Sequence, residues 1–171
     1  MNNFFAQFIL DIQARINLKM PEIKYIDQDL GQLGQVGEDE RPSITYPAIL
    51  IDFPDTDFSD LSGGAQLGVV QISIQLIFAP FSQSWQNAPL SVREKALEYL
   101  ATEQKLHKTL QNWETEYFQA LNRSKIRSQN NNDLGLRVRN IIYTTQFEDY
   151  SPIDEEFKEI EFTFNGSLNT N

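Results

Sequence analysis

The sequence contains no cysteine and only one histidine, His107, in 171 residues. The absence of cysteine excludes disulfides, thiol catalysis and thiolate metal sites. A lone histidine beside Lys105 and Lys108 provides neither a catalytic triad nor a zinc site, so we interpret His107 as a solvated helix residue. No nucleophile–base pair or metal-ligand spacing is recognisable, and the sequence therefore predicts no catalytic residue, no cofactor and no bound metal.

Positive charge is also scarce. The chain has 14 Lys and Arg against 24 Asp and Glu, which gives a net charge of −10. Affinity for nucleic acid depends on clustered Lys and Arg, so this balance argues against a dedicated nucleic-acid binder. The chain lacks a run of about 18 apolar residues that could cross a membrane, and its N-terminus lacks the pattern of a secretory signal. We expect a soluble protein with no membrane partner.

The most informative stretch is 68–80, GVVQISIQLIFAP. Its apolar side chains occupy alternate positions, namely Val70, Ile72, Ile74, Leu76 and Phe78, with Gln71, Ser73 and Gln75 between them. This period of two predicts a strand with one solvent-exposed face. We place it at the centre of a sheet.

Two helices are predicted around this strand. In 2–17, apolar residues recur at helical spacing, as they do from Val92 through Leu97, Leu100 and Leu106 to about Trp113. Ser91 and Glu94 match a capping box at the start of the second helix. The pattern leaves open a continuous helix or a break near 101–102.

Further strands are expected at 43–53, 134–147 and 157–164, with a short one at 22–26. The last two long runs would form an antiparallel hairpin. Long loops are expected at 27–42 and 54–68, and a short flexible tail at the C-terminus. The sequence predicts one α+β domain over 1–171, with an antiparallel or mixed sheet of about four main strands and two principal helices packed on one face.

The expected 54–68 loop carries Phe58 and Leu61 among small or acidic neighbours. Two large apolar side chains in such a setting either mark a contact surface or fold back onto the domain. The carboxylates Asp55, Asp57 and Asp60 have the chemistry of a calcium site, but their spacing does not match an EF-hand loop.

Charge is distributed unevenly in the last third of the chain. Five cations fall where only Asp133 opposes them: Arg123, Lys125, Arg127, Arg137 and Arg139. Residues 148–161 then carry seven carboxylates and Lys158. Either these are solvated faces, or the basic edge of one subunit contacts the acidic edge of the next in a ring. In the second case Arg137 and Arg139 join Phe58 and Leu61 as candidate interface residues.

The order of these elements, with YPAILIDF before the long loop, GVVQISIQLIFAP after it and RVRNIIYTTQFEDYSPIDEEFKEIEFTF near the end, resembles the tail-terminator (tail-completion) proteins of long-tailed bacteriophages. The likeness covers roughly residues 2–166. It implies a non-enzymatic virion protein of the neck, assembled in the host cytoplasm. It also implies a hexameric ring that caps the tail tube, ends its polymerisation and contacts the head–tail connector.

DNA would pass through such a ring without specific binding, because carboxylates repel phosphates. Asp52, Asp55, Asp57 and Asp60, or the carboxylates of 27–42, are candidates for an acidic lumen. Alternatives are another neck protein, such as a head-closure or connector adaptor protein, and a small-ligand-binding or enzymatic α+β domain.

Overall fold

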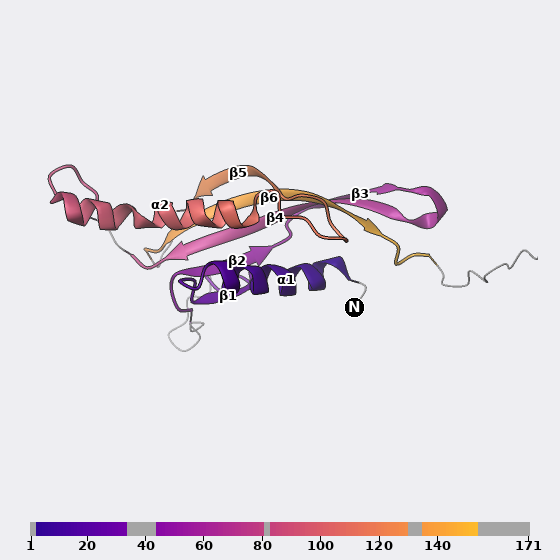
Figure 1. Ribbon diagram of the computed structural model, residues 1–171, viewed down its shortest axis with the longest axis horizontal. Coiled ribbons are helices and arrows are strands. Elements are labelled where there is room, and N and C mark those ends of the chain that lie inside the picture. Colours follow the sequence, from indigo (N-terminus) through magenta and orange to yellow (C-terminus); the bar gives the residue numbers. More distant parts are fainter. Residues whose placement is uncertain (1–2, 34–43, 81–82, 130–134, 154–171) are drawn as a thin grey trace, which may run out of the picture.

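The computed structural model describes residues 3–33, 44–80, 83–129 and 135–153. Helices α1 (Phe4–Lys19) and α2 (Leu90–Leu110) pack on a mixed sheet (Figure 1). The strands are β1 (Tyr25–Gln28), β2 (Ala48–Asp52), β3 (Thr56–Asp60), β4 (Gln66–Phe78), β5 (Asn122–Ser128) and β6 (Arg137–Asp149). The α+β class is confirmed, with six strands in the sheet where about four were expected.

Strand β4 lies at the centre of the sheet, in the order β1-β2-β4-β6-β5. One edge of β4 pairs along its whole length with β6, from Gln66 opposite Asp149 to Phe78 opposite Arg137. The other edge pairs first with β3 and then with β2. Every pair is antiparallel except β1 with β2. The predicted central strand is therefore confirmed.

One face of the sheet carries the main core. Its buried residues include Ile72, Ile74 and Leu76 of β4, and both helices contribute to the same cluster. Helix α1 buries Phe8, Ile9, Ile12 and Ile16, the stripe that its helical spacing predicts. Asn3 caps this helix, because its side chain accepts a hydrogen bond from the Ala6 N–H at 3.2 Å.

Among the described residues, the opposite face carries one small apolar cluster near one end, formed by Ala48, Leu50, Ile77, Leu136 and Val138. Elsewhere this face presents the odd-numbered residues of β4, of which Gln71 is exposed and Gln75 half-buried. No described helix covers it, so we call it the open face. The packing of both helices on one face agrees with the prediction from the sequence.

Two predicted features were wrong, and a break that the sequence left open does not occur. The segment 54–68, expected as a loop, contains β3, the 3-10 turn Ser62–Gly64 and the start of β4. The capping box does not form, since α2 begins at Leu90 with Pro89 as its N-cap and no side-chain cap, which places Ser91 inside the helix. Helix α2 also continues through 101–102 without a break.

Other differences concern strands. The expected strand at 43–53 is confined to Ala48–Asp52, after Pro47, which has no N–H to donate. Strand β5 was not expected, and β6 pairs with β4 and β5. The predicted strand at 157–164, its hairpin with 134–147 and the C-terminal tail lie outside the described residues, as does 34–43 of the expected 27–42 loop. The described part of that loop begins with the end of β1.

Gly68 allows two elements to approach closely. A Cβ atom at this position would lie 2.6 Å from Cε1 of Phe147, whose ring is stacked on Phe4 at a centroid distance of 3.9 Å. The Gly68→Ala variant should lower the free energy of unfolding by about 1–3 kcal/mol, because the Phe147 ring is buried and packed against the rings of Phe4, Phe5 and Phe58. Urea unfolding measures this. Ser59→Ala, exposed in the same hairpin, should change stability by less than about 0.5 kcal/mol.

A second variant tests whether crowding against the Phe147 ring causes the loss of stability in Gly68→Ala. Phe147→Leu removes the ring that the added methyl group at position 68 would meet, so the two substitutions together should cost less than the sum of their separate costs. Strict additivity would show that the contact with Phe147 is not the cause.

Candidate interaction surfaces

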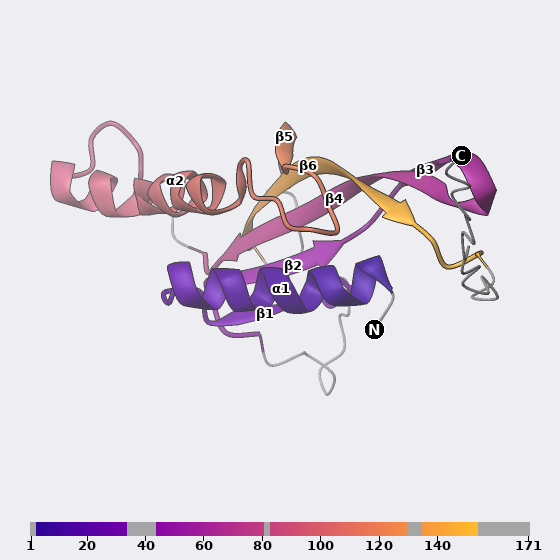
Figure 2. The same ribbon diagram turned by 45° about the vertical axis from the view of Figure 1, so that its right-hand side comes forward.

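The first candidate surface is the hairpin formed by β3 and the start of β4. It projects from one end of the molecule, beyond the N-terminus of α1, in both views (Figures 1 and 2). The Leu61 N–H donates to the Ala65 carbonyl at 2.7 Å and closes the turn. Gly63 has φ of 77°, which glycine adopts without strain. The hairpin is thus an ordered extension of the sheet.

Phe58 and Leu61 both lie on this hairpin and are accessible. Their side chains are 46% and 37% exposed. The Phe58 ring also packs edge-on against Phe147, with centroids 6.0 Å apart. One part of the Phe58 ring therefore packs on the domain, while much of the ring is exposed; a contact with a partner stays a prediction.

The four candidate lumen carboxylates, Asp52, Asp55, Asp57 and Asp60, are all exposed. They follow one edge of the sheet, from the end of β2 to the end of β3. Asp52 pairs with Ser73, and Asp57 with Val69, so both side chains belong to the open face. Asp60 belongs to the helix-covered face, where its Oδ1 accepts a hydrogen bond from Gln66 at 3.5 Å.

Arg137 and Arg139, expected as surface residues of an interface, make contacts within the chain. The Arg139 guanidinium forms an ion pair with Glu103 of α2, and its Nη2 donates to Glu103 Oε1 at 3.3 Å. The Arg137 guanidinium lies over the ring of Tyr99, 4.2 Å from its centroid. Both arginines thus attach α2 to β6, a role that charge distribution alone did not indicate.

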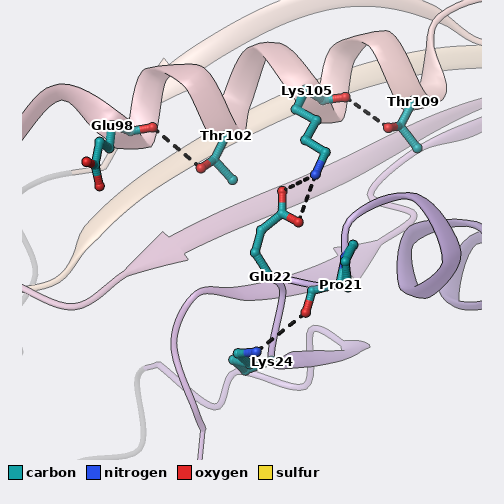
Figure 3. Close-up of polar contacts among 7 residues, drawn as sticks. All are labelled: Pro21, Glu22, Lys24, Glu98, Thr102, Lys105 and Thr109. Atoms are coloured by element: carbon teal, nitrogen blue, oxygen red, sulfur yellow. Dashed lines mark hydrogen bonds and ion pairs between the residues drawn. The ribbon is translucent and has the colours of Figure 1, made fainter. Parts of the chain in front are cut away.

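A second ion pair joins α2 to the segment after α1. Lys105 Nζ lies 2.7 Å from Glu22 Oε1 and 2.9 Å from Oε2 (Figure 3). Nearby, the Thr109 hydroxyl donates to the Lys105 carbonyl at 2.9 Å. The pair is solvent-accessible, so its energetic contribution is small.

His107 is half-buried and faces the sheet, so the expectation of a solvated residue was wrong. Its Nδ1 lies 3.3 Å from the hydroxyl of Tyr143, which is fully buried. Burial raises the pKa of Tyr143 to about 12. Burial, and then the nearby charge of Arg123, lower the pKa of His107 below its ordinary value. The folded protein therefore favours a neutral imidazole.

This shift predicts a pH dependence of stability. Because the pKa of His107 is lower in the folded than in the unfolded chain, protonation of the imidazole favours unfolding. The free energy of unfolding is therefore unaffected by this group above the unfolded pKa of about 6.5, and it decreases as the pH falls below that value. The free energy of unfolding, measured in urea between pH 7.5 and 5.5, should fall more in the wild type than in His107→Gln. Identical slopes would contradict a lowered pKa.

The second candidate surface is the N-terminal half of α2 with the segment before it. In both views this part of α2 extends past the end of the strands, opposite the β3–β4 hairpin (Figures 1 and 2). Four of its large apolar side chains are exposed: Trp85 59%, Leu90 62%, Leu97 45% and Leu100 42%. We call these residues the α2 tip. The sequence pattern had assigned Leu97 and Leu100 to the core-facing side of the helix.

The described part of the chain contains neither a candidate metal site nor a candidate membrane-spanning helix. Within 3–33, 44–80, 83–129 and 135–153 there is no group of three or more His, Cys, Asp or Glu side chains that could hold a metal ion. No helix in those ranges has the length and apolar character needed to cross a membrane.

Comparison with solved structures finds likenesses to this chain, while sequence-based comparison finds none. No protein-family model matches the chain, and no curated protein matches it. Among solved structures, a chain from a structure described as "Virion of native gene transfer agent (GTA) particle" is similar with a TM-score of 0.35 and 12% sequence identity. The match covers 80% of this chain and 94% of that chain.

Proposed function

We propose that the protein is a structural component of a phage virion that caps the tail tube as a hexameric ring, ends tail polymerisation and joins the tail to the head connector. The observation that carries this proposal is the pair of exposed apolar surfaces at opposite ends of the molecule. One is the hairpin with Phe58 and Leu61, and the other is the α2 tip. Exposed apolar groups of this kind are typical of sites that bind other proteins.

A protein that joins two assemblies must bind a different partner at each end, and this arrangement provides for both. The resemblance of the sequence to tail-terminator proteins supports the same role. The exposed carboxylates Asp52 and Asp55 fit a ring through which DNA slides without being held. The partners in this proposal are further copies of the chain, the tail-tube protein and the head–tail connector protein, and the protein has no enzymatic activity.

The proposal predicts the mass of the protein in solution. Light scattering over a range of concentration and salt should give a species of about six 19.7 kDa chains, or a single chain that forms this ring when tail-tube protein is added. A single chain at every concentration, unchanged by tube protein, would contradict the proposal. Binding to the connector without any binding to the tube would instead identify a head-closure or adaptor protein.

A further inference from the structure

Two edges of the sheet carry opposite charge. Strand β3 is the outer strand beside residues 66–70 of β4, and Asp57 and Asp60 on it are exposed, with no Lys or Arg between residues 52 and 65. Strand β5 is the outer strand at the other edge. It carries Arg123, Lys125 and Arg127, with no Asp or Glu between 122 and 129. Each of these strands pairs with a single described strand, β3 with β4 and β5 with β6.

The directions of the strands allow these two edges to meet. From β3 through β4 and β6 to β5, each strand is antiparallel to the one before it. A second copy placed beside the first in the same orientation therefore brings its β3 antiparallel to the β5 of the first. The helix-covered faces of the two sheets then lie on the same side, so the sheet continues from one subunit into the next.

The register places the charges on matching faces. Asp57 pairs with Val69, while Lys125 and Arg127 pair with Ile142 and Asn140. All these positions belong to the open face, because β4 and β6 are in continuous register. Asp60 pairs with Gln66 and Arg123 with Tyr143, and both pairs belong to the helix-covered face. Carboxylates thus meet cations on each face of the continued sheet.

The space beside β3 is also open along the described chain. Strand β1 pairs only with residues 48–51 of β2 and ends before β3 begins. The seven residues of β5 are long enough to pair with all five residues of β3. A free strand edge invites association with other chains, and charges of one sign on each edge select the opposite edge as its partner.

We propose that the β3 edge of one subunit pairs with the β5 edge of the next, as the heterologous contact that closes the ring. This inference rests on the proposed function and specifies how its subunits join. Asp57 and Asp60 then act between subunits, which leaves Asp52 and Asp55 as the carboxylates available to the lumen. A heterologous contact of this kind repeats around a closed ring, with one β3 and one β5 used per subunit.

The test is charge reversal with light-scattering mass as the measurement, with tube protein present if the wild type needs it. D57K/D60K makes both edges basic, and K125D/R127D makes both acidic, so each variant alone should run as single 19.7 kDa chains. The fourfold variant D57K/D60K/K125D/R127D makes β3 basic and β5 acidic, so it should form the ring again. An equimolar mixture of the two double variants should also form it, with the variants alternating.

Two controls accompany this series. E114K/E116K changes two exposed carboxylates in the turn after α2, outside both β3 and β5, and should leave the ring intact. Circular dichroism establishes that each variant is folded. The wild-type ring should also weaken as salt is raised, because solvent-exposed charge pairs are screened.

The outcomes test the β3–β5 contact separately from the proposed function. If both double variants still form the ring, the β3–β5 contact is overturned and the proposed function stands. The same holds if neither the fourfold variant nor the mixture restores the ring. Loss of the ring on deleting 154–171 would likewise overturn the β3–β5 contact, since that segment would then be the partner of an edge. A wild-type chain that never associates, with or without tail tubes, overturns both.

Discussion

Phe8→Ala is expected to lower the free energy of unfolding by about 3–5 kcal/mol, the range for removal of a buried aromatic side chain. Phe8 is fully buried. Its ring lies 5.3 Å from that of Phe118 and 5.8 Å from those of Phe53 and Trp113, between ring centroids. It therefore joins α1 to the end of β2 and to the segment after α2. Domains of this size are stable by only about 5–15 kcal/mol, so the variant should lose much of its stability.

Equilibrium unfolding in urea measures this loss. Leu10→Ala is the matched control, because Leu10 lies on the same helix and is 54% exposed. It should change stability by less than about 0.5 kcal/mol. A loss below about 1 kcal/mol for Phe8→Ala would show that this aromatic cluster does not hold the helix and the sheet together.

The largest effect on function is expected from charge placed on the α2 tip. L97K/L100K should abolish one of the two attachments, to tail tubes or to connector-bearing heads, because a buried, unpaired ammonium opposes docking of an apolar surface. F58K/L61K should abolish the other. Cosedimentation with preformed tubes and with tailless heads measures both attachments separately.

Leu18→Lys serves as the control for these variants, since Leu18 is 81% exposed at the end of α1 and belongs to neither surface. It should retain both attachments. If the α2-tip and hairpin variants also retain both, or lose the same one, the two ends of the molecule do not bind different partners.

Much of the sheet could be predicted because its central strands have one strongly apolar face. β4 alternates for most of its length, and β6 is rich in β-branched and aromatic residues, so both were recognised. Strands β3 and β5 were missed for the opposite reason. Each is an outer strand with most side chains in water, and neither has the apolar alternation on which recognition depends.

The candidate surfaces were predictable only in part. Phe58 and Leu61 stood out because large apolar groups are unusual among acidic neighbours. Both side chains are exposed, and a contact through them stays a prediction. Leu97 and Leu100 follow a helical period, which does not reveal where a helix extends past the sheet that would cover it. Arg137 and Arg139 could not be assigned, because their partners Tyr99 and Glu103 come from a distant helix.

The most direct test is electron microscopy of tail tubes polymerised with and without the purified protein. The proposal predicts that added protein stops tube growth and is found as a ring at one end of each tube. Tubes that grow to the same lengths, with no density for the protein at either end, would contradict a role in capping the tail.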